Sequence, residues 1–576
     1  MYRNDKDRYF WLLAVAATVL LVMFLGVALF NTKGEPREAV VALSMLQSGD
    51  WISPINNGVD IAYKPPFFHW CIALCSLPFG RVSEFTARFP SAVATIVMLL
   101  VAYRAMLRNK TDERLAFLSG LITLTAFEVH RASMACRVDM MLSALIVMAI
   151  YLFQSWYEHR KKVYIPFIIL TMSGAFLTKG PVGVILPCAA IGCFMLVKGE
   201  KFLRAFGICL LFALASCVLP LAWYWMAYLE RGNSFLYLVF EENFLRFTGK
   251  MVYSSHEEPI YYNFLTMLAG FLPYTIMLLI ALFTVKFATL HTVAAPKHWL
   301  RKQWFKIKTM DSQSLISLIS AVLIFCFYCV PKSKRSVYLL PVYPFVAYFV
   351  AKCMINLSRK NFRSFSIYGW IMAAITTLLP ILFIAIKCGA IPYSIFKGKH
   401  AAENVAYLTS IETTPLNIIN IALIALTLAS VYLFIKIFRQ KKSYSACLSV
   451  IGMVFMTYLM LDGIVLPRVY EVKTDYYVAQ EIGKLVPNGK IWDYRSDFKP
   501  GDRNRMHQFS INFYLNDRVK PLDLNRPANG FIIMGDDDLT PFVEAYPNYK
   551  LKKIKKFDHK SCDDKRRLTL YSFTSN

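Results

Sequence analysis

Charged residues are scarce in this chain. Only 18% of its 576 residues are Asp, Glu, Lys or Arg, whereas 56% are hydrophobic. A soluble domain usually has about 25% charged and about 45–50% apolar residues. The apolar excess lies in long continuous runs, which a soluble core does not require. The composition therefore excludes an ordinary soluble protein and predicts a polytopic α-helical membrane protein.

Several other features are missing as well. We find no internal repeat and no low-complexity tract. Most of the 13 cysteines lie inside apolar runs, so they are typical of small buried hydrophobic residues rather than disulfides or metal ligands. A cleavable signal is not expected, because the run from Tyr9 to Phe30 is too long and lacks a small-residue cleavage site.

Apolar runs of about 20 residues, the length that crosses a bilayer, occur about 13 times. We place these spans near residues 9–30, 84–106, 114–129, 139–157, 163–177, 180–198, 203–228, 263–288, 313–330, 336–357, 364–387, 415–437 and 443–466. The spans predict a transmembrane domain over residues 1–467. Its longest outer juxtamembrane loops are expected at 31–83 and 229–262.

Acidic residues are outnumbered, with 37 Asp and Glu against 64 Lys and Arg, for a net charge of +27. No basic patch alternates with stacking aromatic residues outside the spans, so we expect no nucleic-acid partner. The cations fall mainly in alternate loops. This is the pattern expected when loops rich in Lys and Arg stay on the cytoplasmic side of the membrane. This pattern predicts a cytoplasmic N-terminus and an outer C-terminus. The exception is the outer turn 331–335, whose cations require another reason.

The composition becomes polar after Pro467, and residues 468–576 are enough for one small domain on the outer side. Alternating patterns predict a small α/β domain there. Strands are expected near 489–493, 530–534, 549–557 and 567–573, and helices near 474–486, 504–514 and 537–545. The acidic run from Met534 to Asp538 fits a helix N-terminus better than a metal loop.

The first outer loop is long and mixes carboxylates, cations and aromatic residues. Pro36 suits the first turn of a helix, and Gly49 suits its end. The broad apolar stripe between them predicts an amphipathic helix lying in the membrane interface. A plain connecting loop would be shorter, so we expect this loop to carry function.

Ionisable residues are almost absent from the middle of the spans and gather at their outer ends instead. This distribution disfavours a solute channel and favours chemistry on a lipid-borne substrate at the membrane boundary. Two carboxylates, Glu35 and Asp139, lie at that depth, where partial burial can tune a pKa. We therefore predict a catalytic role for both, with simple helix capping as the alternative for each.

Cations cluster at the same outer ends. Lys179, Lys332, Lys334 and Arg335 lie where the anionic head of a lipid would sit, and a leaving phosphate requires such charge as its bond breaks. The alternative is that they are ordinary turn residues or long side chains reaching for water. His256, followed by Glu257 and Glu258, is a weak metal candidate, because no second histidine stands at ligand spacing. No cofactor is required, and a divalent metal stays an alternative.

Seven stretches of this chain resemble the ArnT-type lipid A aminoarabinose transferases, within the wider GT-C glycosyltransferases that include the protein O-mannosyltransferases. They are EPREAVVALSMLQSGDWISP (35–54), YKPPFFHW (63–70), ARFPSAVAT (87–95), RVDMMLSALI (137–146), FLTKGPVG (176–183), HEEPIYYN (256–263) and PKSKRSVYLLPVYP (331–344). The number of spans and the outer C-terminal domain match too.

The resemblance implies a bacterial inner-membrane enzyme that moves a sugar from polyprenyl monophosphate to lipid A or another lipid or glycan acceptor. It places Glu35 and Arg37 in the acidic signature of the first loop. It matches Lys64 to the lysine of the family's Glu-Lys-Pro motif. It also assigns Lys179, Lys332, Lys334 and Tyr338 to phosphate- and lipid-facing positions. This chain departs from the family at Gly34 and Tyr63, where the family has acidic residues.

Three other functions compete with this prediction. A protein O-glycosyltransferase of the same architecture would need a groove for an extended peptide. A lipid-linked sugar transporter would carry charges near mid-membrane and broken helices in repeats, and the sequence has neither. A non-catalytic scaffold is the third alternative.

Overall fold

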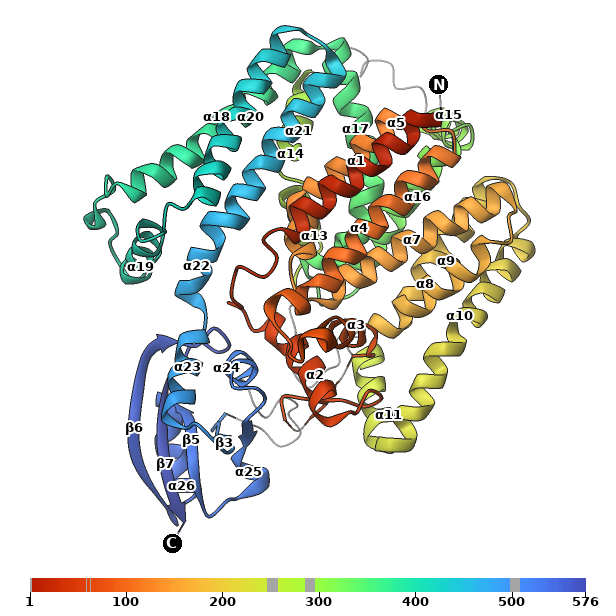
Figure 1. Cartoon of the computed structure of the whole chain (residues 1–576). Coiled ribbons are helices and arrows are strands. Elements are labelled where there is room, and N and C mark those ends of the chain that lie inside the picture. Colours follow the sequence, from red (N-terminus) through yellow and green to blue (C-terminus); the bar gives the residue numbers. More distant parts are fainter. Residues whose placement is uncertain are drawn as a thin grey trace.

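The computed structural model describes residues 3–58, 60–62, 64–245, 257–284, 296–497 and 508–575. It consists of a large helical bundle and a small C-terminal domain at one end of that bundle (Figure 1). The N-terminus lies at the opposite end of the bundle.

The first half of the bundle contains the most buried candidate span. Its helices are α1 (Arg3–Val22), α4 (Glu84–Arg108), α5 (Glu113–Thr125), α6 (Phe127–Ser133), α7 (Val138–His159), α8 (Tyr164–Lys179), α9 (Val182–Val197), α10 (Phe202–Arg231) and α11 (Asn233–Phe240). Helix α7 packs against α4, α8 and α9 and is the most buried of the candidate spans. The outer loop between α1 and α4 forms α2 (Gly34–Ser48) and α3 (Phe67–Ser76).

The second half of the bundle continues with further helices. They are α13 (Tyr261–Gly270), α14 (Tyr274–Thr284), α15 (Pro296–Lys308), α16 (Ser312–Cys329), α17 (Tyr343–Lys360), α18 (Phe362–Lys387), α19 (Ala401–Glu412), α20 (Ile418–Arg439), α21 (Ser443–Met460) and α22 (Leu466–Lys473). A 3₁₀ segment, η3 (Ser336–Val342), leads into α17, and a π-helical segment, η5 (Leu461–Val465), joins α21 to α22.

Within the described residues, eight helices are long and apolar enough to cross a membrane. The number is nine if α13 and α14, which meet at 106°, form one span. The remaining spans predicted from the sequence coincide with α1, α5, α8 and α9, which are shorter or more polar. The prediction of a polytopic helical membrane protein is confirmed.

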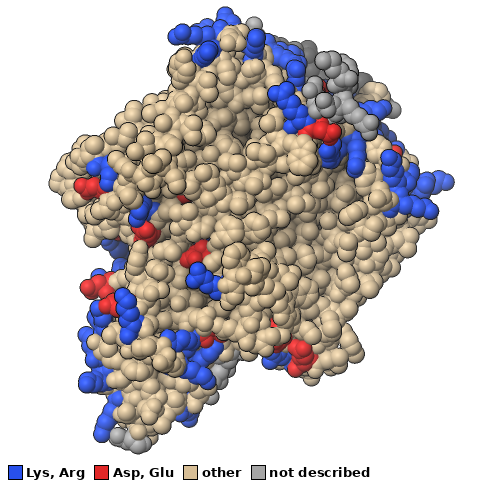
Figure 2. Space-filling view, in the orientation of Figure 1, with Lys and Arg blue, Asp and Glu red and all other residues tan. Residues whose placement is uncertain are grey.

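The outer surface of the bundle is largely apolar, as contact with lipid requires. Lys and Arg gather at the N-terminal end of the bundle and on the C-terminal domain, and a largely uncharged belt lies between them (Figure 2). Large apolar side chains are exposed on the helices of the bundle, among them Leu203 (81% accessible) on α10 and Ile418 (86%) on α20. Exposure on this scale would be costly in water and is favourable against lipid.

The C-terminal domain is built on one mixed sheet. Its strand order is β4-β3-β5-β7-β6, with β3 parallel to β4 and β5, and β7 antiparallel to β5 and β6. The strands are β3 (Ile491–Asp493), β4 (Val519–Pro521), β5 (Asn529–Gly535), β6 (Tyr549–Lys560) and β7 (Arg567–Ser575), and the helices are α23 (Tyr476–Leu485), α24 (Phe509–Tyr514), α25 (Leu522–Asn525) and α26 (Leu539–Ala545). Residues Asp536–Asp538 form a 3₁₀ turn that leads into α26, as expected of a helix N-terminus.

The C-terminal domain packs directly on the first outer loop. Helix α24 contacts α2, Gln47 donates a hydrogen bond to the Asn516 carbonyl (3.2 Å), and Tyr514 donates to Glu84 (2.8 Å). Ten of the 15 residues of α2 are buried. The broad apolar stripe of α2, predicted to lie in the membrane interface, packs against α3 and α24, and α24 comes from a distant part of the sequence.

Candidate active site

The antiparallel packing of α7 and α8 brings Asp139 and Lys179 together. Asp139 is in the first turn of α7, and Lys179 is the last residue of α8. The Lys179 ammonium donates a hydrogen bond to the Asp139 carboxylate. It also lies 4.1 Å from the ring centroid of Tyr338, a cation–π contact. Three residues named from the sequence thus meet at one end of the bundle.

A second carboxylate, Glu38, lies one turn into α2 and is 3% exposed. The Lys64 ammonium donates to it, and Arg37 Nη2 donates at 3.1 Å. The ring of His69, in the first turn of α3, places Nε2 2.9 Å from Glu38 Oε2. Helices α2 and α3 pack against each other, which is why these partners converge.

The partners of Glu38 determine its charge. Burial alone would raise the pKa of this carboxyl, but Lys64, His69 and Arg37 hold the pKa well below its ordinary value. Glu38 is therefore ionised at neutral pH. A carboxylate held in this way is a weak proton acceptor, because general-base catalysis is most efficient when the pKa is near the working pH.

These groups share one cavity. Its lining contains five cations and two carboxylates, so the cavity is net positive: Arg37, Lys64, Arg137, Lys179 and Arg335 with Glu38 and Asp139. Tyr338 and Gly34 complete most of the wall. An excess of cations around a partly enclosed space at the edge of a membrane domain suits an anionic headgroup.

Glu35 does not line this cavity. Its carboxylate accepts hydrogen bonds from Arg88 Nε (2.8 Å) and Arg88 Nη2 (3.1 Å) on α4, and from the backbone N–H of Cys136 (2.9 Å). Glu35 is 7% exposed and Arg88 3%. This buried ion pair joins α2, α4 and the segment before α7, and so fixes the position of the neighbouring Glu38.

The lysines of turn 331–335 have different surroundings. Lys334 is buried, and its ammonium donates to the backbone carbonyl of Pro331 at 2.6 Å. The backbone carbonyl of Lys332 accepts from the N–H of Glu258 at 3.2 Å, but neither lysine is among the residues that line the cavity. Of the predicted cations in this turn, Arg335 alone is brought to the cavity.

His256, the weak metal candidate, lies outside the described residues, as does Tyr63. Across the described ranges, no group of three or more His, Cys, Asp or Glu side chains is placed to hold a metal ion.

Sequence reasoning missed three members of the site. Glu38, His69 and Arg137 lie within the stretches 35–54, 63–70 and 137–146, but none of the three is among the predicted site residues. One signal was available for Glu38, since it lies one helical turn from Glu35 on a helix rich in buried positions. No local pattern indicates that His69 packs on Glu38.

Comparisons with known proteins agree with this architecture. The family model for dolichyl-phosphate-mannose-protein mannosyltransferases matches residues 63–225. An undecaprenyl phosphate-alpha-4-amino-4-deoxy-L-arabinose arabinosyl transferase from Proteus mirabilis is 27% identical over 68% of this chain and 69% of its own length. An uncharacterised protein of Aquifex aeolicus is 25% identical over 84% of both chains.

Among solved structures, ArnT from Cupriavidus metallidurans, crystallised with undecaprenyl phosphate, superposes with a TM-score of 0.70. The sequence identity is 19%, and 97% of each chain is covered. The chain therefore shares the fold of ArnT over nearly its whole length. In sequence and in fold, the chain is thus similar to ArnT-type arabinosyl transferases.

Proposed function

We propose that this protein transfers a sugar from a polyprenyl-monophosphate donor to lipid A or another lipid or glycan acceptor at the outer face of the bacterial inner membrane. Residues 1–467 would form the catalytic membrane domain and residues 468–576 a periplasmic domain. The N-terminus would be cytoplasmic, as the loop charges indicate. The curated relatives suggest an amino sugar as the transferred group.

The observation that carries this proposal is the net positive cavity beside the first turn of α7. Lys179, Arg335, Lys64, Arg37 and Arg137 line it together with two carboxylates. A donor of this class leaves as a polyprenyl phosphate, whose negative charge grows as its bond to the sugar breaks. Fixed cations around the phosphate stabilise that charge in the transition state.

The reaction that fits is a single displacement. An acceptor oxygen forms a bond to the anomeric carbon of the sugar while the bond from that carbon to the donor phosphate oxygen breaks. The electron pair of the broken bond leaves with the polyprenyl phosphate, and the configuration at the carbon inverts. Lys179 is the best placed cation, because Asp139 and the Tyr338 ring fix its ammonium.

The carboxylates favour one kind of acceptor. Glu38 is ionised, and three basic side chains surround it, so it is a poor base for a hydroxyl group. A lipid A phosphate is already anionic and gives up no proton when it attacks. In that case Glu38 and Asp139 would orient the basic side chains and bind the cationic amine of an amino sugar. We assign Glu35 to supporting this arrangement through Arg88.

A protein acceptor is the second candidate. The family model that matches residues 63–225 is described by protein mannosylation. It covers the outer loop from Tyr63 onward and helices α3 to α10, so it does not include α2 or Glu38.

The test is transfer by the purified protein in liposomes, with labelled undecaprenyl-phosphate sugars as donors. Lipid A and an unfolded serine- and threonine-rich polypeptide are offered as acceptors in turn. We expect labelled lipid A and release of undecaprenyl phosphate, both lost in the Asp139→Asn variant. Transfer to the polypeptide alone would support the second candidate. Transfer to neither acceptor from any donor would refute both.

A further inference from the structure

A second cavity lies at the end of the bundle away from the C-terminal domain. It has a volume of about 470 Å³ and lies between the turn that joins α4 to α5, the last turn of α7, the start of α16 and the side of α17. Ligand pockets are commonly about 300–1,000 Å³. The active-site cavity is lined by residues at the opposite ends of α7 and α8, so the two are separate.

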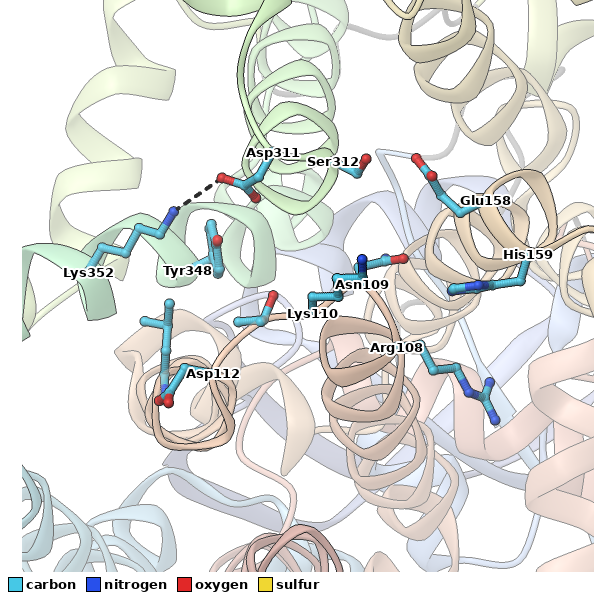
Figure 3. Close-up of a pocket in the computed structure, with 12 residues that line it drawn as sticks. Arg108, Asn109, Lys110, Asp112, Glu158, His159, Asp311, Ser312, Tyr348 and Lys352 are labelled. Atoms are coloured by element: carbon cyan, nitrogen blue, oxygen red, sulfur yellow. Dashed lines mark hydrogen bonds and ion pairs between the residues drawn. The ribbon is translucent and has the colours of Figure 1, made fainter. Parts of the chain in front are cut away.

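Some of the charged groups around this second cavity already have structural partners. Asp112 caps α5 by accepting from the N–H groups of Arg114 and Leu115, and Asp311 caps α16 by accepting from the N–H of Ser314. Lys352 donates to the Ser314 hydroxyl at 2.7 Å and lies 3.8 Å from Asp311. Figure 3 shows this Asp311–Lys352 pair at one side of the cavity.

Other polar groups are not satisfied. On the α4–α5 turn, the buried Asn109 Nδ2 and Thr111 Oγ1 have no hydrogen-bond partner within the described residues. Glu158 Oε1, near the end of α7, is equally buried and lacks a hydrogen bond there. It lies 3.6 Å from Lys198 Nζ, which donates to Ser312 instead. Figure 3 shows Glu158 and Ser312 across the cavity from Asn109 and Lys110.

Buried polar atoms without partners are costly and are rare in folded proteins. Here they are arranged by type. The two on the α4–α5 turn can donate, and the exposed cation Lys110 stands beside them. The one on α7 is a carboxylate oxygen, which can only accept. A ligand that satisfies all of them has an acceptor at one end and a donor at the other, and the charges of Lys110 and Glu158 favour an anionic acceptor and a cationic donor.

We propose that this cavity binds a phosphate ester that carries a primary ammonium group, the headgroup chemistry of phosphoethanolamine. The phosphate oxygens would accept from Asn109 and Thr111 beside Lys110, and the ammonium would donate to Glu158. The headgroup belongs either to a membrane phospholipid or to a soluble phosphoethanolamine ester. A choline headgroup lacks the N–H donors, and a glycerol headgroup lacks the cation.

The test uses delipidated full-length protein in detergent. Its thermal unfolding is followed while phosphatidylethanolamine, phosphatidylcholine, phosphatidylglycerol or soluble glycerophosphoethanolamine is added. Two variants change the cavity, Glu158→Gln and Thr111→Val. The matched control is Asp7→Asn, which removes a carboxylate at the same end of the bundle, where the exposed Asp7 pairs with Arg104.

Phosphatidylethanolamine should stabilise the wild-type protein at lower concentration than the other two lipids. Glu158→Gln should weaken its apparent affinity about tenfold and Thr111→Val about fivefold, the usual effects of losing a charged and a neutral hydrogen bond. Asp7→Asn should change it less than twofold. If Glu158→Gln does not fold, Thr111→Val provides the test.

The soluble ester identifies the source of the headgroup. Stabilisation by the lipid alone supports a phospholipid, and stabilisation by both supports a site that reads the headgroup itself. Equal effects of the three lipids would overturn the proposal. So would an unchanged affinity in both cavity variants.

Discussion

The buried ion pair of Glu35 and Arg88 allows a structural role of Glu35 to be distinguished from a role in sugar transfer. We consider the variant Glu35→Gln, which keeps the shape of the side chain and removes its charge. Oε1 of the new amide can still accept from Arg88 Nε and from the Cys136 N–H, as Glu35 Oε1 does. Its NH₂ group, however, would replace the oxygen that accepts from Arg88 Nη2, so two donors would face each other.

The magnitude follows from the burial of both partners. Arg88 is 3% exposed, and its remaining hydrogen bonds go to the carbonyls of Leu25 (3.1 Å) and Ala28 (2.5 Å), which carry no full charge. Removing one partner of a buried ion pair costs about 3–5 kcal/mol. Folded proteins are stable by only about 5–15 kcal/mol. We therefore expect Glu35→Gln to lower the unfolding midpoint markedly.

The assay is thermal unfolding of the purified variant in detergent, together with sugar transfer per folded molecule at low temperature. Transfer should stay within about threefold of wild type, because Glu35 does not line the cavity. Glu38→Gln is the matched control on the same helix and should lose most transfer. An unchanged unfolding midpoint with lost transfer in Glu35→Gln would refute the supporting role and restore Glu35 as a participant in the chemistry.

Three further predictions concern pH and the C-terminal domain. Lys64, His69 and Arg37 overcome the effect of burial and hold the pKa of Glu38 well below 4.5. The ionised form of Glu38 therefore stabilises the fold above pH 4.5, and this stabilisation is lost as the pH falls through the lowered pKa. Glu38→Gln should flatten the acid side of the stability curve, measured by thermal unfolding from pH 3 to 7; an unchanged acid side would contradict this. Burial raises the pKa of Asp493 to about 8, so the folded protein keeps a proton that the unfolded chain releases above about pH 4, and stability falls between pH 4 and 8. Asp493→Asn should remove that slope and raise the unfolding midpoint at pH 7.5 by a few degrees, and a lower midpoint would refute the assignment. Tyr514→Phe removes the hydrogen bonds to Glu84 and from the Phe30 N–H. It should weaken packing of the C-terminal domain on the bundle by about 1–2 kcal/mol. Limited proteolysis should therefore cut that domain faster than in the wild-type protein.

The fold class could be predicted because the bilayer imposes a length on apolar runs. The predicted spans coincide with helices, and the small α/β domain follows from the polar composition after Pro467 and from strand and turn patterns. The short strand β4 was missed, because three residues give too little alternation to detect.

The site could be predicted only in part, because its partners come from separate elements. Glu35 and Glu38 are one helical turn apart on α2, so helical periodicity places them on nearly the same side. Which of them faces the cavity depends on where α4 places Arg88 and where α3 places His69. Burial of α2 likewise depends on α24, more than 450 residues further along the chain, and no local pattern carries that information.

The most direct test of the account compares two lysines that the sequence did not distinguish. Lys179 lines the net positive cavity beside Asp139, whereas Lys332 is exposed and does not line it. Sugar transfer in liposomes is measured against donor concentration for Lys179→Met and Lys332→Met. The account predicts at least a tenfold loss of kcat/KM for Lys179→Met and less than a twofold change for Lys332→Met. Equal losses, or a larger loss for Lys332→Met, would contradict the proposed phosphate site.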